Sequence, residues 1–247
     1  MSFSVIIPSR NSANLFPCVA AVREHEPDAR IIVVDDGLDR APVGVECVQG
    51  EKPFCYARNI NIGIRAAYRY TREDIATNSH CLYMGHPEGV VLLNDDAILQ
   101  TPGGFSAMAQ ACRDNPEYGL IGATANIVGN PNQHPKNIGL RQESRMVCFL
   151  CVYIPRTTLD RVGLLDERFT GYGLDDDDFS FSVRAAGLKI GVHDGCYVDH
   201  GSLVSSFRGD PKTPADYRPN LRRFIEKWGT DNWSQPREKS QFPELFA

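Results

Sequence analysis

Three carboxylate clusters and one late histidine are the groups in this sequence of 247 residues that could do chemistry together. The clusters are residues 35–36, 94–96 and 175–178, and the histidine is His200. The first two clusters come directly after runs of valine, isoleucine and leucine. A buried parallel strand of that composition delivers the residues after it to the mouth of an α/β sheet. Several such strand ends predict an enzyme site for a divalent cation and a phosphorylated ligand, rather than a binding module.

The segment Asn94-Asp95-Asp96 is a candidate metal site. Because successive side chains at a strand end point to opposite sides, we expect only one of the two carboxylates to bind a cation. Carboxylate oxygens suit Mg²⁺ or Mn²⁺, which proteins hold largely through the phosphates of a substrate. The alternative is a strand end followed by an aspartate that caps a helix.

The four consecutive aspartates at 175–178 repel one another, and something must offset that repulsion. A helix that begins here would offset part of it through its dipole, so capping alone is one interpretation. The other is catalysis, since a carboxylate held among like charges near a substrate hydroxyl can act as a general base. His200 is either a structural histidine or a ligand beside the acidic strand ends. Arg58, at a predicted helix start, either faces solvent or meets a diphosphate.

The elements that must position these residues alternate between apolar runs and helical patterns. This order predicts an α/β fold with a mostly parallel sheet flanked by helices. Strands are expected at 4–7, 31–34, 90–93, 118–123 and 147–154, with short edge strands at 188–192 and 196–198. Helices are expected at 15–25, 56–70, 105–114, 156–162, 179–186 and 220–228. We expect one domain at 1–205 and a C-terminal extension at 206–247 that contains the amphipathic helix 220–228.

Composition and charge narrow the function classes. The chain is 42% apolar and 23% charged, which is ordinary for a globular protein. Its net charge of −5 gives no attraction to nucleic acid or to an anionic membrane. No apolar run approaches the ~20 residues that cross a bilayer, and the first residues lack the basic segment of a signal peptide. We therefore expect a cytoplasmic protein, with peripheral membrane contact left open.

In their order and spacing, these residues resemble the motifs of the family 2 glycosyltransferases, which have the GT-A fold. The resemblance runs from Ser4 to about His200 and covers most of the chain. Its parts are SVIIPSRN at 4–11, VVDDG at 33–37, ARN at 57–59, NDD at 94–96, VGLLDERF at 162–169, GYGLDDDD at 171–178 and VDH at 198–200. Asn94 replaces the first acid of the family's DxD metal motif, and Asp175 replaces the usual glutamate of its E-D-x-D motif.

The resemblance implies an inverting, metal-dependent glycosyltransferase that moves a sugar from a nucleoside-diphosphate sugar to an acceptor hydroxyl. Asp176 would be the general base. Mn²⁺ or Mg²⁺ would be held mostly by Asp96 and His200. The acceptor would be bound by Asp175, Tyr172 and Gly173. The donor nucleotide would be bound by Pro8, Ser9, Arg10, Asp35, Asp36, Arg58, Asn94 and Asp95.

The same resemblance limits the partners. The donor would be a UDP-, GDP- or dTDP-sugar, and the acceptor a glycan, a lipid-linked intermediate or a small molecule. The acidic charge disfavours a nucleic-acid acceptor. The polar segment 126–145 and the residues after Gly201 are candidates for acceptor recognition, and 71–89 for a lid or a contact surface. The sequence carries no signal for the oligomeric state.

Two other function classes stay open. A sugar-phosphate nucleotidyltransferase also arranges carboxylates around a nucleotide and Mg²⁺ on an α/β sheet. Such enzymes usually carry a glycine-rich loop after the first strand, whereas the turn here reads PSRN at 8–11. A non-catalytic carbohydrate- or Ca²⁺-binding domain could use the run 175–178, although that run lacks EF-hand spacing.

Overall fold

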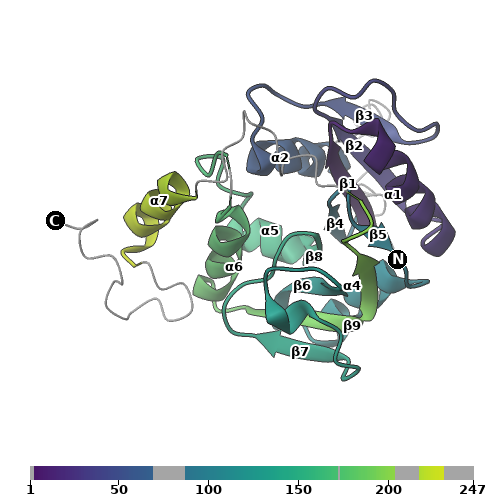
Figure 1. The fold of residues 1–247 in the computed structure, drawn as a ribbon. Coiled ribbons are helices and arrows are strands. Elements are labelled where there is room, and N and C mark those ends of the chain that lie inside the picture. The colour runs from purple at the N-terminus through teal and green to yellow at the C-terminus, as the bar shows by residue number, and fades with distance from the viewer. Residues whose placement is uncertain (1–2, 69–86, 172, 204–216, 231–247) are drawn as a thin grey trace, which may run out of the picture.

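The computed structural model describes residues 3–68, 87–171, 173–203 and 217–230, which form a central sheet flanked by helices (Figure 1). The strands are β1 (Phe3–Ser9), β2 (Arg30–Asp35), β3 (Glu46–Gln49), β4 (Gly89–Leu93), β5 (Ile98–Leu99), β6 (Tyr118–Ala125), β7 (Leu140–Glu143), β8 (Cys151–Pro155) and β9 (Lys189–Asp199). The helices are α1 (Ser12–His25), α2 (Tyr56–Ala67), α4 (Gly104–Asp114), α5 (Arg156–Val162), α6 (Asp175–Ala185) and α7 (Arg218–Trp228), with a 3-10 turn η2 (Pro131–Gln133).

The sheet has the strand order β3-β2-β1-β4-β8-β6-β9-β5, and β7 also pairs with β9. The pairs β1–β2, β1–β4, β2–β3 and β6–β9 are parallel. The pairs β4–β8, β6–β8, β5–β9 and β7–β9 are antiparallel. The α/β class and the flanking helices are therefore confirmed, but the described sheet is mixed rather than mostly parallel. The reversal enters at β8, an antiparallel strand between β4 and β6.

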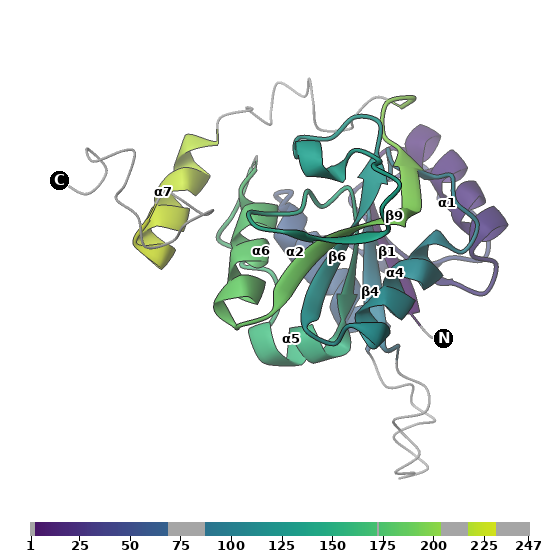
Figure 2. The same cartoon turned by 90° about the horizontal axis from the view of Figure 1, so that it is seen from below.

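Helices cover both faces of the sheet, which explains why its central strands are apolar without alternation. Helices α1 and α4 pack on one face through one core cluster, and α2, α5 and α6 pack on the other face through a second (Figure 2). Within β1, Val5 and Ile7 enter the first cluster and Ile6 enters the second. Gly63 lets α2 approach closely, since a Cβ there would lie 2.3 Å from Ile6 Cγ2.

Several predicted elements differ from the observed ones. Strand β8 begins at Cys151, and the apolar residues 147–150 before it form an irregular segment and a turn. The two predicted edge strands, at 188–192 and 196–198, form one strand, β9, which begins at Lys189 and lies inside the sheet and not at its edge. The pairing of β6 with β9 shifts its register after His193, and this shift accommodates the polar residues that separate the two predicted strands. Strands β3, β5 and β7 were not expected, because each is short and carries little apolar periodicity.

The predicted amphipathic helix near the C-terminus is confirmed as α7. Its apolar residues pack with Phe169, Leu174 and Phe181 in a third cluster on the outer side of α6. The predicted helix 56–70 is present as α2 up to Ala67, and the rest of that prediction lies outside the described residues. Among the described helices, none combines the length and the apolar character that crossing a membrane requires.

Candidate active site

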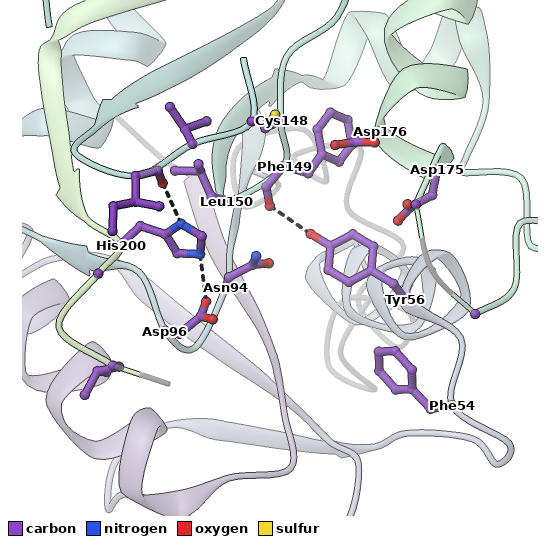
Figure 3. Close-up of a pocket in the computed structure, with 17 residues that line it drawn as sticks. Phe54, Tyr56, Asn94, Asp96, Cys148, Phe149, Leu150, Asp175, Asp176 and His200 are labelled. Atoms are coloured by element: carbon purple, nitrogen blue, oxygen red, sulfur yellow. Dashed lines mark hydrogen bonds and ion pairs between the residues drawn. The ribbon is translucent and has the colours of Figure 1, made fainter. Parts of the chain in front are cut away.

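A pocket of about 610 Å³ opens where several loops meet at the ends of the central strands (Figure 3). The segments that line it come after β4, β6 and β9, before β8, and at the starts of α2 and α6. Its lining residues are Phe54, Tyr56, Asn94, Asp96, Ile127, Val128, Gly129, Cys148, Phe149, Leu150, Gly171, Gly173, Asp175, Asp176, His200, Gly201 and Leu203. A crevice beyond the carboxyl ends of parallel strands is where open α/β sheets bind ligands.

Asp96 and His200 meet on one side of this pocket. The His200 Nε2 atom lies 3.4 Å from Asp96 Oδ1. On the other side of the imidazole ring, Nδ1 lies 2.8 Å from the Ile127 carbonyl oxygen. Because a carbonyl only accepts hydrogen bonds, Nδ1 carries the proton, and in the neutral ring Nε2 presents a lone pair toward the carboxylate. Two electron-pair donors that face each other at this distance fit a cation between them.

The metal that the resemblance implies would therefore find two ligands here, one oxygen and one nitrogen. Within the described part of the chain, no group of three or more histidine, cysteine or acidic side chains forms a complete metal site. Mn²⁺ and Mg²⁺ tolerate such a sparse protein set when phosphate oxygens and water fill the other positions. The donor set fits a cation that binds together with a diphosphate.

Asp95 and Asp96 lie in the turn after β4 and have different partners. Asp95 Oδ2 accepts a hydrogen bond of 2.6 Å from the Ser9 hydroxyl, and both of these side chains are buried. Neither residue lines the pocket, whereas Asn94 does. Ser9 and Asp95, both predicted to bind the donor nucleotide, thus form a hydrogen bond that links the ends of β1 and β4.

Asp35, Asp36 and Arg58 do not line the pocket. Asp35 Oδ1 accepts hydrogen bonds from the backbone N–H groups of the two residues that follow Asp36, at 2.8 and 2.7 Å. The buried Asp36 carboxylate pairs with Lys52 at 2.9 Å. The Arg58 guanidinium donates to the Pro53 carbonyl and lies 3.6 Å from Glu51.

The opening turn reaches the pocket indirectly. Pro8 is buried within β1. The Arg10 guanidinium lies 6.0 Å from the centre of the Phe54 ring, and Phe54 lines the pocket. Among the residues predicted to bind the donor nucleotide, Arg10 thus contacts the wall of the pocket through Phe54.

Asp175 and Asp176 form the opposite side of the pocket, at the first turn of α6 (Figure 3). Helix α6 begins after Leu174, which has a left-handed backbone with φ +69°. Few residues other than glycine adopt this conformation, and such local strain concentrates at functional sites. The predicted helix 179–186 thus begins four residues earlier than expected, and the aspartates are its first turn.

The environment of this first turn raises the pKa of its carboxylic acids. Burial, and then the neighbouring charge of Asp176, raise the pKa of Asp175 to about 7. Burial also raises the pKa of Asp176, while backbone N–H groups, including that of Asp177, act to lower it. A carboxylate with a pKa nearer neutrality accepts a proton more readily than an ordinary one. Both carboxylates therefore line the pocket in surroundings that raise their pKa values.

The other two aspartates of the run do not line the pocket. Asp177 is buried, and burial raises its pKa. Asp178 is buried against α7, where Lys227 and Trp228 donate hydrogen bonds to it. Gly173 lines the pocket, and Tyr172 lies outside the described residues. Of the predicted acceptor residues, Asp175 and Gly173 are therefore on the pocket wall.

An aromatic wall joins the two acidic sides, and the sequence analysis missed it. The Tyr56 hydroxyl donates a hydrogen bond of 3.1 Å to the Phe149 carbonyl. The Phe149 ring packs edge-on against Phe179 at 5.9 Å. Tyr56 stands directly before the ARN segment, so its position was available as a signal. Phe149 was hidden inside an apolar run that predicted a strand.

The raised pKa of Asp175 predicts a pH-dependent effect of Asp175→Asn on stability. The unfolded pKa of aspartate is about 3.9, so the folded protein binds more protons between pH 4 and 7. The charge of wild-type Asp175 therefore destabilises the fold progressively between about pH 4 and 7, and its full effect is present above pH 7. We expect Asp175→Asn to raise Tm by about 2–4 °C at pH 8 and by much less at pH 5. Thermal unfolding without metal or nucleotide measures this. Asp160→Asn, at an exposed aspartate of α5, should show no such pH-dependent gain; an equal gain at both pH values for Asp175→Asn would contradict the charged-state argument.

Comparison with known proteins agrees with this architecture. No protein-family model matches the chain. An uncharacterized protein of Sinorhizobium fredii (strain NBRC 101917 / NGR234), y4gI, is 24% identical over an alignment of 277 positions. The alignment covers 94% of this chain and 28% of that protein. The chain thus corresponds to little more than a quarter of this curated relative.

Three solved structures share the fold. GalNAc-T7, crystallised with UDP, GalNAc and Mn²⁺, matches with a TM-score of 0.64 and 13% identity over 91% of this chain and 47% of its own. Residues 1–349 of Staphylococcus aureus TarS match with a TM-score of 0.57 and 15% identity, over 80% of this chain and 60% of that one. The mannosyltransferase PcManGT of Pyrobaculum calidifontis, in complex with GDP-Man and Mn²⁺, matches with a TM-score of 0.57 and 13% identity, over 99% and 68%. The chain has the α/β fold of the GT-A glycosyltransferases.

Proposed function

We propose that this chain is a metal-dependent, inverting glycosyltransferase of the family 2 type, which moves a sugar from a nucleoside-diphosphate sugar to an acceptor hydroxyl. The observation that carries the proposal is the pocket with two acidic sides. Asp96 and His200 face each other on one side, and Asp175 and Asp176 lie on the other. Two proteins of similar fold were solved with Mn²⁺ and a nucleotide or nucleotide sugar: GalNAc-T7 with UDP and PcManGT with GDP-Man.

On the donor side, Asp96 and His200 would hold Mn²⁺ or Mg²⁺. When bound, the cation neutralises charge that develops on the departing diphosphate. The Ile127 carbonyl fixes the imidazole so that Nε2 faces the cation position. Asp35, Arg58 and Arg10 would bind the nucleotide, and Arg10 contacts the ring of Phe54, a residue that lines the pocket.

On the acceptor side, Asp176 takes the proton of the attacking hydroxyl through its carboxylate. Asp175 accepts a hydrogen bond from the acceptor and orients it, and Gly173 provides backbone space beside it. Tyr56 and Phe149 form an apolar surface between the two sides, against which a sugar ring can pack.

The separation of the two sides supports inversion. In a direct displacement, the nucleophile and its base approach the sugar carbon opposite the leaving group. The base lies on one side of the pocket, and the two residues proposed to hold the cation lie on the other. A sugar held between the two sides would have that arrangement. Residues 1–205 would form the transferase domain, with α7 in the extension. The donor would be a UDP-, GDP- or dTDP-sugar, and the acceptor a glycan, lipid-linked intermediate or small molecule.

Calorimetric titration of the intact chain with UDP, GDP and dTDP, each with and without Mn²⁺, tests the proposal. We expect one diphosphate to bind with a Kd that rises at least about tenfold when Mn²⁺ is removed. The corresponding nucleotide sugar should then support transfer, and NMR of the product should show an inverted anomeric centre. Absence of binding by every diphosphate would contradict the proposal. Pyrophosphate release from a nucleoside triphosphate and a sugar 1-phosphate would assign a nucleotidyltransferase instead.

A further inference from the structure

Helix α7 contacts the chain on both sides of the pocket aspartates, at the segment before α6 and within α6 itself. The Asn220 side chain, which is buried, donates a hydrogen bond of 2.6 Å to the Gly173 carbonyl, just before Asp175. Beyond Asp176, both carboxylate oxygens of Asp178 receive donors from α7: Trp228 Nε1 at 2.8 Å and Lys227 Nζ at 2.8 Å. The two aspartates that face the pocket therefore lie between two attachment points to one helix.

The Asp178 attachment is built as a buried charge pair. Asp178 is 2% exposed. Lys227 also pairs with Asp166 at 3.0 Å, so one ammonium group joins α7 to helix α6 and to the segment after α5. Burial raises the pKa of Asp178, and Lys227 is the strongest influence that opposes this. A buried carboxylate that loses its cation carries a large penalty, so the pair strongly favours one position of α7 on α6.

Apolar contacts fix the same position. The Phe181 ring lies 4.4 Å from the Trp228 ring and 5.6 Å from the Phe224 ring. Together with Leu174, these residues form the cluster that covers the outer side of α6. Figures 1 and 2 show α7 on that side, away from the sheet. Because α6 packs on the sheet through Phe179 and Val183, its first turn is held from inside and from outside.

We infer that α7 is a clamp that positions the first turn of α6, with Lys227 and Trp228 as positioning residues for Asp175 and Asp176. The inference rests on the proposed function, because it assigns these residues to the acceptor side of the same pocket. Leu174 explains why a clamp is needed. Its left-handed backbone directly precedes the aspartates, and a strained turn relaxes when its surroundings no longer hold it. Catalytic rates fall steeply with displacements of about 1 Å, so a relaxed turn costs turnover before it costs binding.

Donor binding does not depend on this clamp. Asp96 and His200 are positioned by β4, β9 and the Ile127 carbonyl, none of which contacts α7 through a hydrogen bond or ion pair among those described. Damage to the clamp should therefore change kcat while the Kd of the nucleoside diphosphate stays the same. A role confined to global stability would instead reduce the number of diphosphate-binding sites and leave kcat per site unchanged.

Three full-length variants test the clamp. Lys227→Met keeps the aliphatic stem and removes both ion pairs, Trp228→Phe keeps an aromatic ring and removes the hydrogen bond, and Lys227→Arg restores the charge. We expect kcat, counted per diphosphate-binding site, to fall about 10- to 100-fold in Lys227→Met and about threefold in Trp228→Phe. The diphosphate Kd should change by less than about twofold. Lys227→Arg should recover most of the turnover.

Lys189→Met is the matched control, because Lys189 forms an exposed ion pair with Glu117 far from the pocket. It should leave kcat unchanged. Hydrogen exchange gives a readout without catalysis: the amides of residues 174–178 should exchange faster in Lys227→Met and not in Lys189→Met. Unchanged kcat and exchange in Lys227→Met would overturn the clamp. If the wild type neither binds a diphosphate nor transfers sugar, the proposed function fails, and the exchange experiment still decides whether α7 holds the turn.

Discussion

Asp176→Asn is expected to lower kcat for sugar transfer by about 10²- to 10⁴-fold, which is the usual contribution of a general base. Asparagine is nearly isosteric with aspartate and still accepts a hydrogen bond, so it keeps the link to the Asp177 N–H. It cannot take a proton from the acceptor hydroxyl. The Kd of the nucleoside diphosphate should stay within about twofold, since Asp176 lies on the side of the pocket away from Asp96 and His200.

Steady-state kinetics with saturating donor, together with calorimetry of the diphosphate, measures both halves of this prediction. Asp177→Asn is the matched control, because it removes the same charge from the same helical turn at a side chain that does not line the pocket. It should retain turnover within about threefold. Wild-type turnover in Asp176→Asn would exclude Asp176 as the base. A larger loss of kcat in Asp175→Asn than in Asp176→Asn would exchange the two roles. This comparison is needed because the pKa of Asp175 is also raised, to about 7.

The strand ends that carry the site were predictable because burial leaves a strong trace in sequence. The strands β1, β2 and β4 are buried on both sides, and each is a run of valine, isoleucine and leucine that stops at a polar turn. Their parallel order and the polar residues after them followed from that trace. Backbone geometry predicted that only one of Asp95 and Asp96 would bind a cation, and the family resemblance assigned that role to Asp96; in the structure Asp95 accepts a hydrogen bond from Ser9.

The meeting of Asp96 with His200 could not be derived from local patterns. It depends on the two-residue strand β5, whose Ile98 pairs with Asp199, the residue directly before His200. A strand of two residues has no measurable periodicity, so its register is invisible in the sequence. The imidazole is then oriented by the Ile127 carbonyl, which lies in a segment that was expected to be an irregular polar loop. Tertiary pairing, not local propensity, creates this pair.

The aromatic wall was missed for a related reason. Residues 147–150 are apolar and lead directly into β8, so composition favours a longer strand. The chain instead turns at Phe149 and Leu150 and exposes them to the pocket. An apolar run does not distinguish a buried strand from an apolar ligand wall, since both exclude water. The start of β8 is set by tertiary pairing: in the antiparallel register with β4, Cys151 is the first residue of β8 and lies opposite Leu93, the last residue of β4.

Removal of both Asp96 and His200 is expected to abolish the Mn²⁺ dependence of diphosphate binding. Each single change, Asp96→Ala or His200→Ala, takes away one of the two facing electron-pair donors. Each should raise the diphosphate Kd in Mn²⁺ by about 10- to 100-fold, the usual effect of disturbing a metal's protein environment. The double variant should bind diphosphate equally weakly with and without Mn²⁺, because no other carboxylate in the described pocket lies beside this pair.

Calorimetry with Mn²⁺ and the diphosphate, and transfer assays at several Mn²⁺ concentrations, measure these effects. Asp95→Asn is the sharpest control, because it removes a carboxylate one residue away that bonds to Ser9 instead of facing the pocket. It should lower Tm through its buried hydrogen bond and leave the Mn²⁺ dependence intact. Unchanged Mn²⁺ dependence in the Asp96/His200 double variant would mean that the cation binds elsewhere. Loss of the dependence in Asp95→Asn alone would mean that the strand end presents the other carboxylate to the metal. Since the two aspartates are adjacent and have different partners, these outcomes decide which of them binds the cation.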